Sequence, residues 1–171
     1  MTYRPKETSK AARLTAFIAV ALAVGLFYAS AVVKSYPFVY QFAAIVLMIA
    51  GVEVLVKYVL SDHVYEAADK DLKIYRVTGK KSVCVASLAY EESLCGVVAS
   101  NDYQAEKDKF PKTQIVVNAC KNIFPQSYSL YFFNFNGRNA VLKFEPDALF
   151  AAFLDDKIRR ALAAKEDEDN A

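Results

Sequence analysis

A run of twenty residues without a charged side chain, Leu14 to Val33, is the feature that most constrains this chain. At about 1.5 Å per residue, a helix of that length spans about 30 Å, the thickness of the hydrocarbon core of a bilayer. A second charge-free run, Pro37 to Val52, continues through two charged residues to Leu60. The sequence therefore predicts a membrane α-helical hairpin at 14–60, with helices at 14–33 and 37–60 and a basic segment at 1–13.

The sequence of the first helix leaves two questions, whether the helix is cleaved as a signal peptide and whether its small residues have a packing role. Its Ala29-Ser30-Ala31 triplet resembles a signal-peptide cleavage site, but its apolar core is longer than the roughly 7 to 15 residues that signal peptides use, which favours a retained span. Its small residues Ala21, Gly25 and Ala29 are spaced four apart. Such a row either allows close approach of a second helix or arises by chance in an alanine-rich span.

Basic residues near the ends of the spans predict their orientation, because positively charged segments stay in the cytoplasm. Four basic residues precede the first helix, whereas the link between the helices carries only Lys34. Lys57, at the exit of the second helix, agrees with this polarity. We therefore expect a multi-pass protein of the cell membrane with both termini in the cytoplasm.

The remaining charge argues against nucleic acid as a partner. Residues 1–60 carry six basic and two acidic side chains, whereas residues 61–171 carry fifteen and seventeen. The second part thus lacks the basic field of a nucleic-acid-binding domain. Its three cysteines, Cys84, Cys95 and Cys120, have no Cys-x-x-Cys spacing, so we expect reduced, half-buried strand residues rather than disulfides or a zinc site.

From residue 61 onward the pattern is that of short strands and turns. We expect strands at 62–68, 72–78, 82–88, 94–99, 114–120, 127–135 and 140–145, with a long loop at 101–112. Asn136-Gly137 predicts a type I′ hairpin between the last two strands, because both central residues of that turn need positive φ. In the last strand, alternation of apolar and polar residues predicts one buried face and one largely wet face.

A helix is expected over 146–164, with Pro146 at its first position and Asp147 in its first turn. Apolar residues recur there at three- and four-residue spacing and predict one buried face: Leu149, Phe150, Phe153, Leu154, Ile158 and Leu162. The mostly acidic segment 165–171 is expected to be a disordered tail.

About seven strands followed by a C-terminal amphipathic helix is the element order of pleckstrin-homology-like (PH-like) domains, an open barrel or curved antiparallel sheet capped by the helix. With the two spans, the segments at 73–81, 131–137 and 142–147 make the chain resemble a family of small uncharacterised membrane proteins of clostridial-type bacteria. The resemblance implies a membrane hairpin and a cytoplasmic PH-like domain at 61–164. It supplies no catalytic residue.

The inventory of reactive residues predicts no enzyme, metal site or cofactor. His63 is the single histidine, expected to be solvated at the membrane exit, and one histidine cannot build a multi-histidine metal site. Gly96 is the one glycine outside the spans and predicted turns, so no phosphate-binding loop is predicted. The pairs Glu91-Glu92 and Asp155-Asp156 are expected to be solvated surface.

Two groups of charged residues are candidate sites. Glu53 and Lys57 form a candidate polar pair inside the membrane, read either as a structural i,i+4 pair or as part of a proton or ion path. The second group is basic, consists of Lys70 and four further residues, and surrounds the hairpin at 78–82. It could contact anionic lipid headgroups, although the acidic residues Asp69 and Asp71 lie among these basic residues in the sequence. Its candidate lipid-contact residues are Lys73, Arg76, Lys80 and Lys81.

These features favour a non-catalytic binding or scaffolding module held at the cytoplasmic face of the membrane. Its expected partners are the lipid bilayer and another protein or further copies of the chain, because PH-like folds generally serve recognition. The alternative is a lipid sensor acting through the basic hairpin. A small ion-handling or proton-handling subunit that uses Glu53 is the third possibility.

Overall fold

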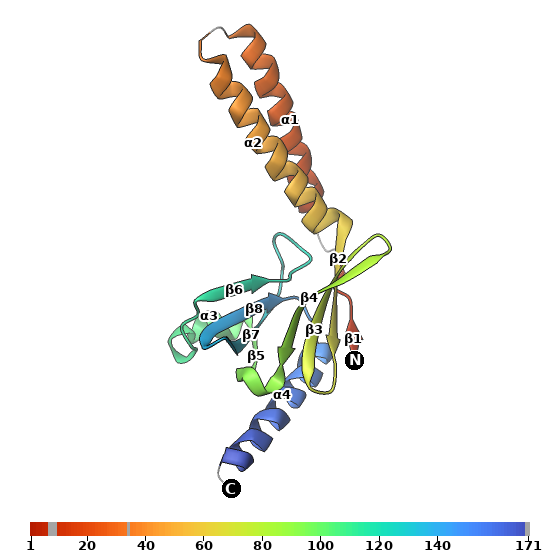
Figure 1. Cartoon of the computed structure of the whole chain (residues 1–171), viewed down its shortest axis with the longest axis vertical. Coiled ribbons are helices and arrows are strands. Elements are labelled where there is room, and N and C mark those ends of the chain that lie inside the picture. The colour runs from red at the N-terminus through yellow and green to blue at the C-terminus, as the bar shows by residue number, and fades with distance from the viewer. Residues whose placement is uncertain (7–9, 34, 170–171) are drawn as a thin grey trace. The chain divides into compact units, whose positions relative to one another are not determined.

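The computed structural model describes residues 1–6, 10–33 and 35–169, and its chain divides into two compact units (Figure 1). The helical unit contains residues 7–61 and 122–124. The sheet unit contains residues 1–6, 62–121 and 125–171. Lys34 in the predicted link, residues 7–9 of the basic segment and the last two residues of the predicted tail lie outside the described residues.

The helical unit is an α-helical hairpin, as predicted. Helix α1 (Ala11–Val32) packs against α2 (Pro37–Val54), which continues as a π-helix, η1 (Leu55–Leu60). The Ser61 hydroxyl donates to the carbonyl of Val56 at 2.8 Å and so satisfies one acceptor that the end of the helix leaves open.

Small residues make the contact between the two helices. Ala12, Ala16 and Ala23 of α1 are buried, as are Ala44 and Gly51 of α2. A methyl group added at Gly51 would lie 3.2 Å from the Cβ of Ala19, which is closer than most real contacts of that atom. Gly25, the central residue of the predicted row, does not make this contact, since nothing lies within 4 Å of a methyl group built there.

The outer surface of this hairpin is apolar. The most apolar stretches of the two helices have mean hydropathies of 2.1 and 2.2, and only 11% of the residues in each are buried. Among the exposed side chains are Phe17, Leu22, Phe38, Phe42 and Ile49. Both helices are therefore long and apolar enough to cross a membrane, and they are not the buried core of a soluble domain.

The first sheet has the strand order β1-β2-β3-β4. Its strands are β1 (Thr2–Tyr3), β2 (Ser61–Ala67), β3 (Asp71–Thr78) and β4 (Lys81–Ala89). Strand β1 pairs antiparallel with β2, with Tyr3 opposite Tyr65. The sequence prediction missed β1, because two residues in a basic segment carry no strand periodicity.

The second sheet has the order β5-β7-β8-β6. Its strands are β5 (Ser93–Ala99), β6 (Ile115–Asn118), β7 (Ser129–Phe135) and β8 (Arg138–Phe144). Strand β6 runs parallel to β8, which departs from the predicted antiparallel arrangement. The β7–β8 turn is confirmed, with φ of 52° at Asn136 and 78° at Gly137.

Three short helical segments join the strands of the sheet unit. A 3-10 turn, η2 (Tyr90–Glu92), links β4 to β5. The stretch predicted as a long loop instead holds α3 (Ser100–Ala105) and a 3-10 turn, η3 (Lys107–Lys109). Tyr103 and Phe110 of this stretch pack on Phe132 and so cover the outer face of the second sheet. The face of β8 that we expected to be wet is therefore partly buried.

The main core lies between the two sheets and helix α4 (Ala148–Asp169). Phe150, Leu154 and Ile158 of α4 are fully buried there, at the spacing that the sequence predicted. Leu149 was expected on the same face and is 70% exposed instead. Both sheets contribute aromatic and aliphatic side chains to this core: Tyr65, Leu72, Ile74, Tyr131, Phe133, Leu142 and Phe144.

Helix α4 begins and ends later than predicted. The carboxylate of Asp147 accepts from the backbone N–H of Phe150 at 2.7 Å, so Asp147 acts as the cap and Pro146 lies outside the helix. The helix continues to Asp169, and the prediction of a disordered tail is wrong over 165–169. Lys165 helps to hold this turn, since its amine donates to the carbonyl of Glu91 at 3.2 Å.

An acidic side chain that was expected to be solvated joins α4 to the second sheet. Asp155 accepts a hydrogen bond from the backbone N–H of Val97 in β5 at 2.9 Å and pairs with Arg159 at 2.7 Å. A side chain on Gly96 would collide with this carboxylate. Gly96 is therefore required for the approach of Asp155 to the strand rather than for a turn.

Candidate functional site

The residues of the predicted basic group lie at different places along β3 and its two turns. Arg76, Lys80 and Lys81 are exposed at the β3–β4 turn. Lys73 lies near the start of β3, away from this turn, and pairs with Asp71 at 3.6 Å. Lys70 belongs to the β2–β3 turn at the opposite end of β3, about 26 Å away for eight extended residues. The group that could meet a charged surface therefore consists of Arg76, Lys80 and Lys81.

The β3–β4 turn lies at the end of the sheet where β2 begins. Strands β2 and β3 are neighbours joined by the short turn 68–70, so they run in opposite directions, and the end of β3 lies beside the start of β2. Strand β2 starts at Ser61, directly after η1. The basic side chains are thus at the end of the sheet through which the chain leaves the helices.

Strand β4 is an edge of its sheet, and its first half is exposed on both faces. Residues 81–85 are all exposed, and they include the apolar Val83 and Val85 with the thiol of Cys84 between them. An edge strand presents unpaired N–H and C=O groups that another strand can bind. The sequence pattern did not predict that β4 lies at an edge, because that position depends on the order in which the strands pair.

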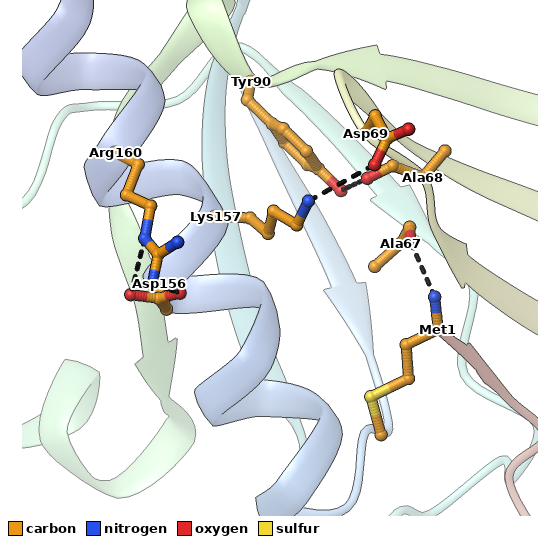
Figure 2. Close-up of polar contacts among 8 residues, drawn as sticks. All are labelled: Met1, Ala67, Ala68, Asp69, Tyr90, Asp156, Lys157 and Arg160. Carbon is orange, nitrogen blue, oxygen red and sulfur yellow. Dashed lines mark hydrogen bonds and ion pairs between the residues drawn. The ribbon is translucent and has the colours of Figure 1, made fainter.

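A pocket of about 260 Å³ lies in the sheet unit beside α4. Figure 2 shows Lys157 reaching towards Asp69, Tyr90 beside Ala68, Arg160 on Asp156, and the Met1 amine on the carbonyl of Ala67. The pocket is lined by Asp69, Lys70, Tyr90, Glu91, Lys157, Arg160 and Ala161.

The polar groups of this pocket are occupied by one another. Lys157 lies 3.4 Å from the Asp69 carboxylate, and Arg160 lies 2.7 Å from Asp156. The Tyr90 hydroxyl donates to the carbonyl of Ala68 at 3.2 Å, and burial raises the pKa of this phenol. The Lys157–Asp69 pair joins α4 to the β2–β3 turn, the Tyr90 hydrogen bond joins η2 to the same turn, and the Arg160–Asp156 pair lies within α4. These contacts align no nucleophile with a base.

A second pocket, of about 490 Å³, opens in the segment that follows α3. Aromatic and charged side chains make up most of its lining, together with one proline and one threonine: Tyr103, Lys107, Asp108, Phe110, Pro111, Lys112 and Thr113. Lys109, in the same turn, pairs with Glu106 at 2.8 Å. Among the residues that the structure describes, this pocket also lacks a catalytic arrangement.

Polar groups are buried where β2 begins, and sequence reasoning missed this cluster. His63, expected to be solvated, is 1% exposed. The Lys121 amine lies 2.8 Å from the Asp62 carboxylate, and the backbone N–H of Lys121 donates to Glu145 at 2.7 Å. Tyr65 donates to the carbonyl of Ala119 at 2.8 Å. No spacing in the sequence links these residues, which come from three separate segments.

The candidate pair in the second helix consists of an exposed Glu53 and a half-buried Lys57. The Lys57 amine lies 5.2 Å from the centre of the Tyr58 ring, a distance typical of a cation–π contact. Within residues 1–6, 10–33 and 35–169, no ion pair joins Glu53 to Lys57.

The cysteines differ from one another in environment. Cys84 is exposed, Cys95 is half-buried and Cys120 is buried. Burial raises the pKa of the Cys95 thiol, so this group is a poor nucleophile. In the part of the chain that the structure describes, no three His, Cys, Asp or Glu side chains come together as ligands for a metal ion.

Comparison of the chain with protein-family models, with curated proteins and with solved structures finds no match.

Proposed function

We propose that this chain is a two-span membrane protein whose sheet unit is a non-catalytic, PH-like binding module at the cytoplasmic face. The observation that carries the membrane assignment is the exposed apolar surface of α1 and α2, since only 11% of the residues in each apolar stretch are buried. Contact of this surface with water has a large free-energy cost, which a covering of lipid removes. Two open sheets followed by a C-terminal helix support the PH-like assignment, although β6 parallel to β8 is an addition to that layout.

We further propose that the module binds a second copy of the chain through β4. Pairing two β4 strands antiparallel about Cys84 places Val83 opposite Val85 of the other copy, and Lys81 opposite Ser87. This register sets no like charges against each other, and it satisfies the open edge of both sheets. Confinement to a membrane raises the effective concentration of the strands, so a short contact suffices.

Oxidation of native membranes tests this pairing. In the proposed register the two Cys84 residues face each other, and opposite Cα atoms of antiparallel strands lie about 4.5 to 5.5 Å apart, within disulfide range. We expect an added oxidant to convert the chain into a disulfide-linked dimer, seen on a non-reducing gel. Cys84→Ser should abolish the dimer.

The control moves the thiol by one residue. In the Cys84→Ser, Val83→Cys variant, the two thiols lie on a diagonal with Cα atoms about 7 to 8 Å apart, which is too far for a disulfide. This variant should remain monomeric on the gel. Equal cross-linking at both positions would indicate random collision and contradict the pairing.

An anionic-lipid sensor is the second candidate function. It is favoured by the position of Arg76, Lys80 and Lys81 at the end of the sheet where β2 leaves η1. Basic side chains near an anionic leaflet each contribute about 1 kcal/mol, and their attraction falls with salt. Exposed Val83 and Val85 on the same hairpin add apolar surface that suits a membrane boundary.

A binding experiment with lipid-coated beads tests this second function. The full chain in detergent is mixed with beads that carry anionic or zwitterionic lipid. The sensor hypothesis predicts salt-sensitive retention on the anionic beads and its loss in Lys80→Glu, Lys81→Glu. The matched control, Lys107→Glu, Lys112→Glu, changes charge equally at another surface and should be retained. Equal retention of both variants would exclude a role for the hairpin in lipid binding.

A further inference from the structure

The loop 122–124 groups with the helical unit, although the residues on both sides of it belong to the sheet unit. Its last residue, Phe124, is 70% exposed. Leu60, the last residue of η1, is 55% exposed in the same unit. The helical unit therefore includes an exposed apolar residue, Phe124, that lies sixty-four positions after the end of η1 in the sequence.

The chain that leads into this loop is fixed to the residues that follow η1. Lys121 is only 4% exposed, and its amine pairs at 2.8 Å with Asp62, the second residue after η1. Its backbone N–H donates to Glu145 at 2.7 Å. Just before it, the carbonyl of Ala119 accepts from the Tyr65 hydroxyl at 2.8 Å. The loop thus starts next to the residue through which the chain leaves the second helix.

The residues at that end of the helix are of the types that lie at a membrane surface. Lys57 and Tyr58 are in η1, and both lysine and tyrosine are common at the headgroup level, where the apolar part of the side chain is buried and the polar end is wet. A loop can enter this layer because its backbone groups still find water or headgroups as partners, which they do not find in the hydrocarbon core.

We propose that Phe124 inserts into the headgroup layer of the leaflet from which η1 emerges and forms a third membrane contact of this chain. The inference rests on the proposed function, since it requires that α1 and α2 span a bilayer. Its occupant is lipid, because Phe124 is an exposed apolar side chain in the same compact unit as the two apolar helices. The contact gives the sheet unit a second attachment to the membrane in addition to the link at Ser61.

Tryptophan fluorescence tests the contact directly, because the chain has no native tryptophan. Three single variants of the full chain are placed in phosphatidylcholine vesicles with bromine at a shallow or a deep position of the acyl chain. Phe124→Trp reports on the loop. Ile49→Trp, at a position with 63% exposure near the middle of the apolar stretch Pro37–Leu60, reports on the span. Leu149→Trp reports on the sheet unit, at a position with the same 70% exposure as Phe124.

We expect the Phe124→Trp variant to lose most of its emission with shallow bromine and less with deep bromine. Its emission maximum should lie at shorter wavelength than that of Leu149→Trp. The Ile49→Trp variant should be quenched more by deep bromine, whereas Leu149→Trp should be unaffected by bromine and quenched by aqueous iodide. Circular dichroism of each variant establishes that it has folded.

The other outcomes separate the third contact from the spans. Quenching of Ile49→Trp without quenching of Phe124→Trp would overturn the third contact and leave the two spans standing. Absence of bromine quenching in both variants would overturn the proposed membrane spans themselves. Protection of Phe124→Trp from both bromine and iodide would show that protein covers the loop, which also excludes the lipid contact.

Discussion

Replacing Phe150 by alanine is expected to lower the free energy of unfolding of the sheet unit by about 3 to 5 kcal/mol, the usual cost of removing a buried phenylalanine ring. Phe150 is fully buried and lies within 5.8 Å of Tyr3 and 6.3 Å of Tyr65, measured between ring centres. Its loss opens a cavity where α4 meets the first sheet. A urea titration of the full chain in detergent, followed by the near-ultraviolet circular dichroism of its tyrosines, measures the change.

The neighbouring residue provides the matched control. Leu149→Ala removes a side chain of similar apolar character that is exposed, so we expect a change within about 0.5 kcal/mol. Phe153→Ala should fall between the two, since Phe153 is only partly buried. A similar decrease in the free energy of unfolding in all three variants would contradict the exposed position of Leu149 on α4. It would support the wider buried face that the sequence predicted.

The second large effect is the all-or-none response of reporters to membrane topology. We expect a reporter that is active only in the cytoplasm to work when fused after Asn170, and one that is active only outside to be silent. Four basic residues before the first helix favour a cytoplasmic N-terminus, and two spans would return the chain to that side. Fusion of the same reporters between α1 and α2 should give the opposite pair of activities.

Changing the flanking charges tests the cause of this topology. Arg4, Lys6, Lys10 and Arg13 replaced together by glutamine should weaken the bias and raise the activity of the outside reporter at the C-terminus. An outside reporter that is already active in the unchanged chain would contradict the proposed cytoplasmic location of the sheet unit.

Local sequence was a good guide wherever neighbouring residues decide the structure. The charge-free runs predicted both helices of the helical hairpin, because a membrane span depends on length and apolar composition. Asn136-Gly137 predicted the β7–β8 turn, because that turn depends on backbone sterics. Six of the seven predicted strands overlap strands at closely similar positions, and the segment at 114–120 contains the short β6. The spacing of Phe150, Leu154 and Ile158 predicted the buried face of α4.

The contacts between distant segments were not predictable in this way. Gly96 has no local role, and its purpose appears only when Asp155 reaches the N–H of Val97. Gly25 and Gly51 look alike in the sequence, yet only Gly51 faces the other helix, since the rotation of each helix depends on the packing of the pair.

The sequence by itself determined that two apolar helices precede a mainly β region with a C-terminal amphipathic helix, because hydrophobic period and turn chemistry act over a few residues. The tertiary structure alone decided that β1 joins the first sheet, that β6 runs parallel to β8, that β4 is left as an open edge and that Lys121 meets Asp62. These features depend on which surfaces meet when segments far apart in the chain bury their apolar faces together, and no local pattern records that choice.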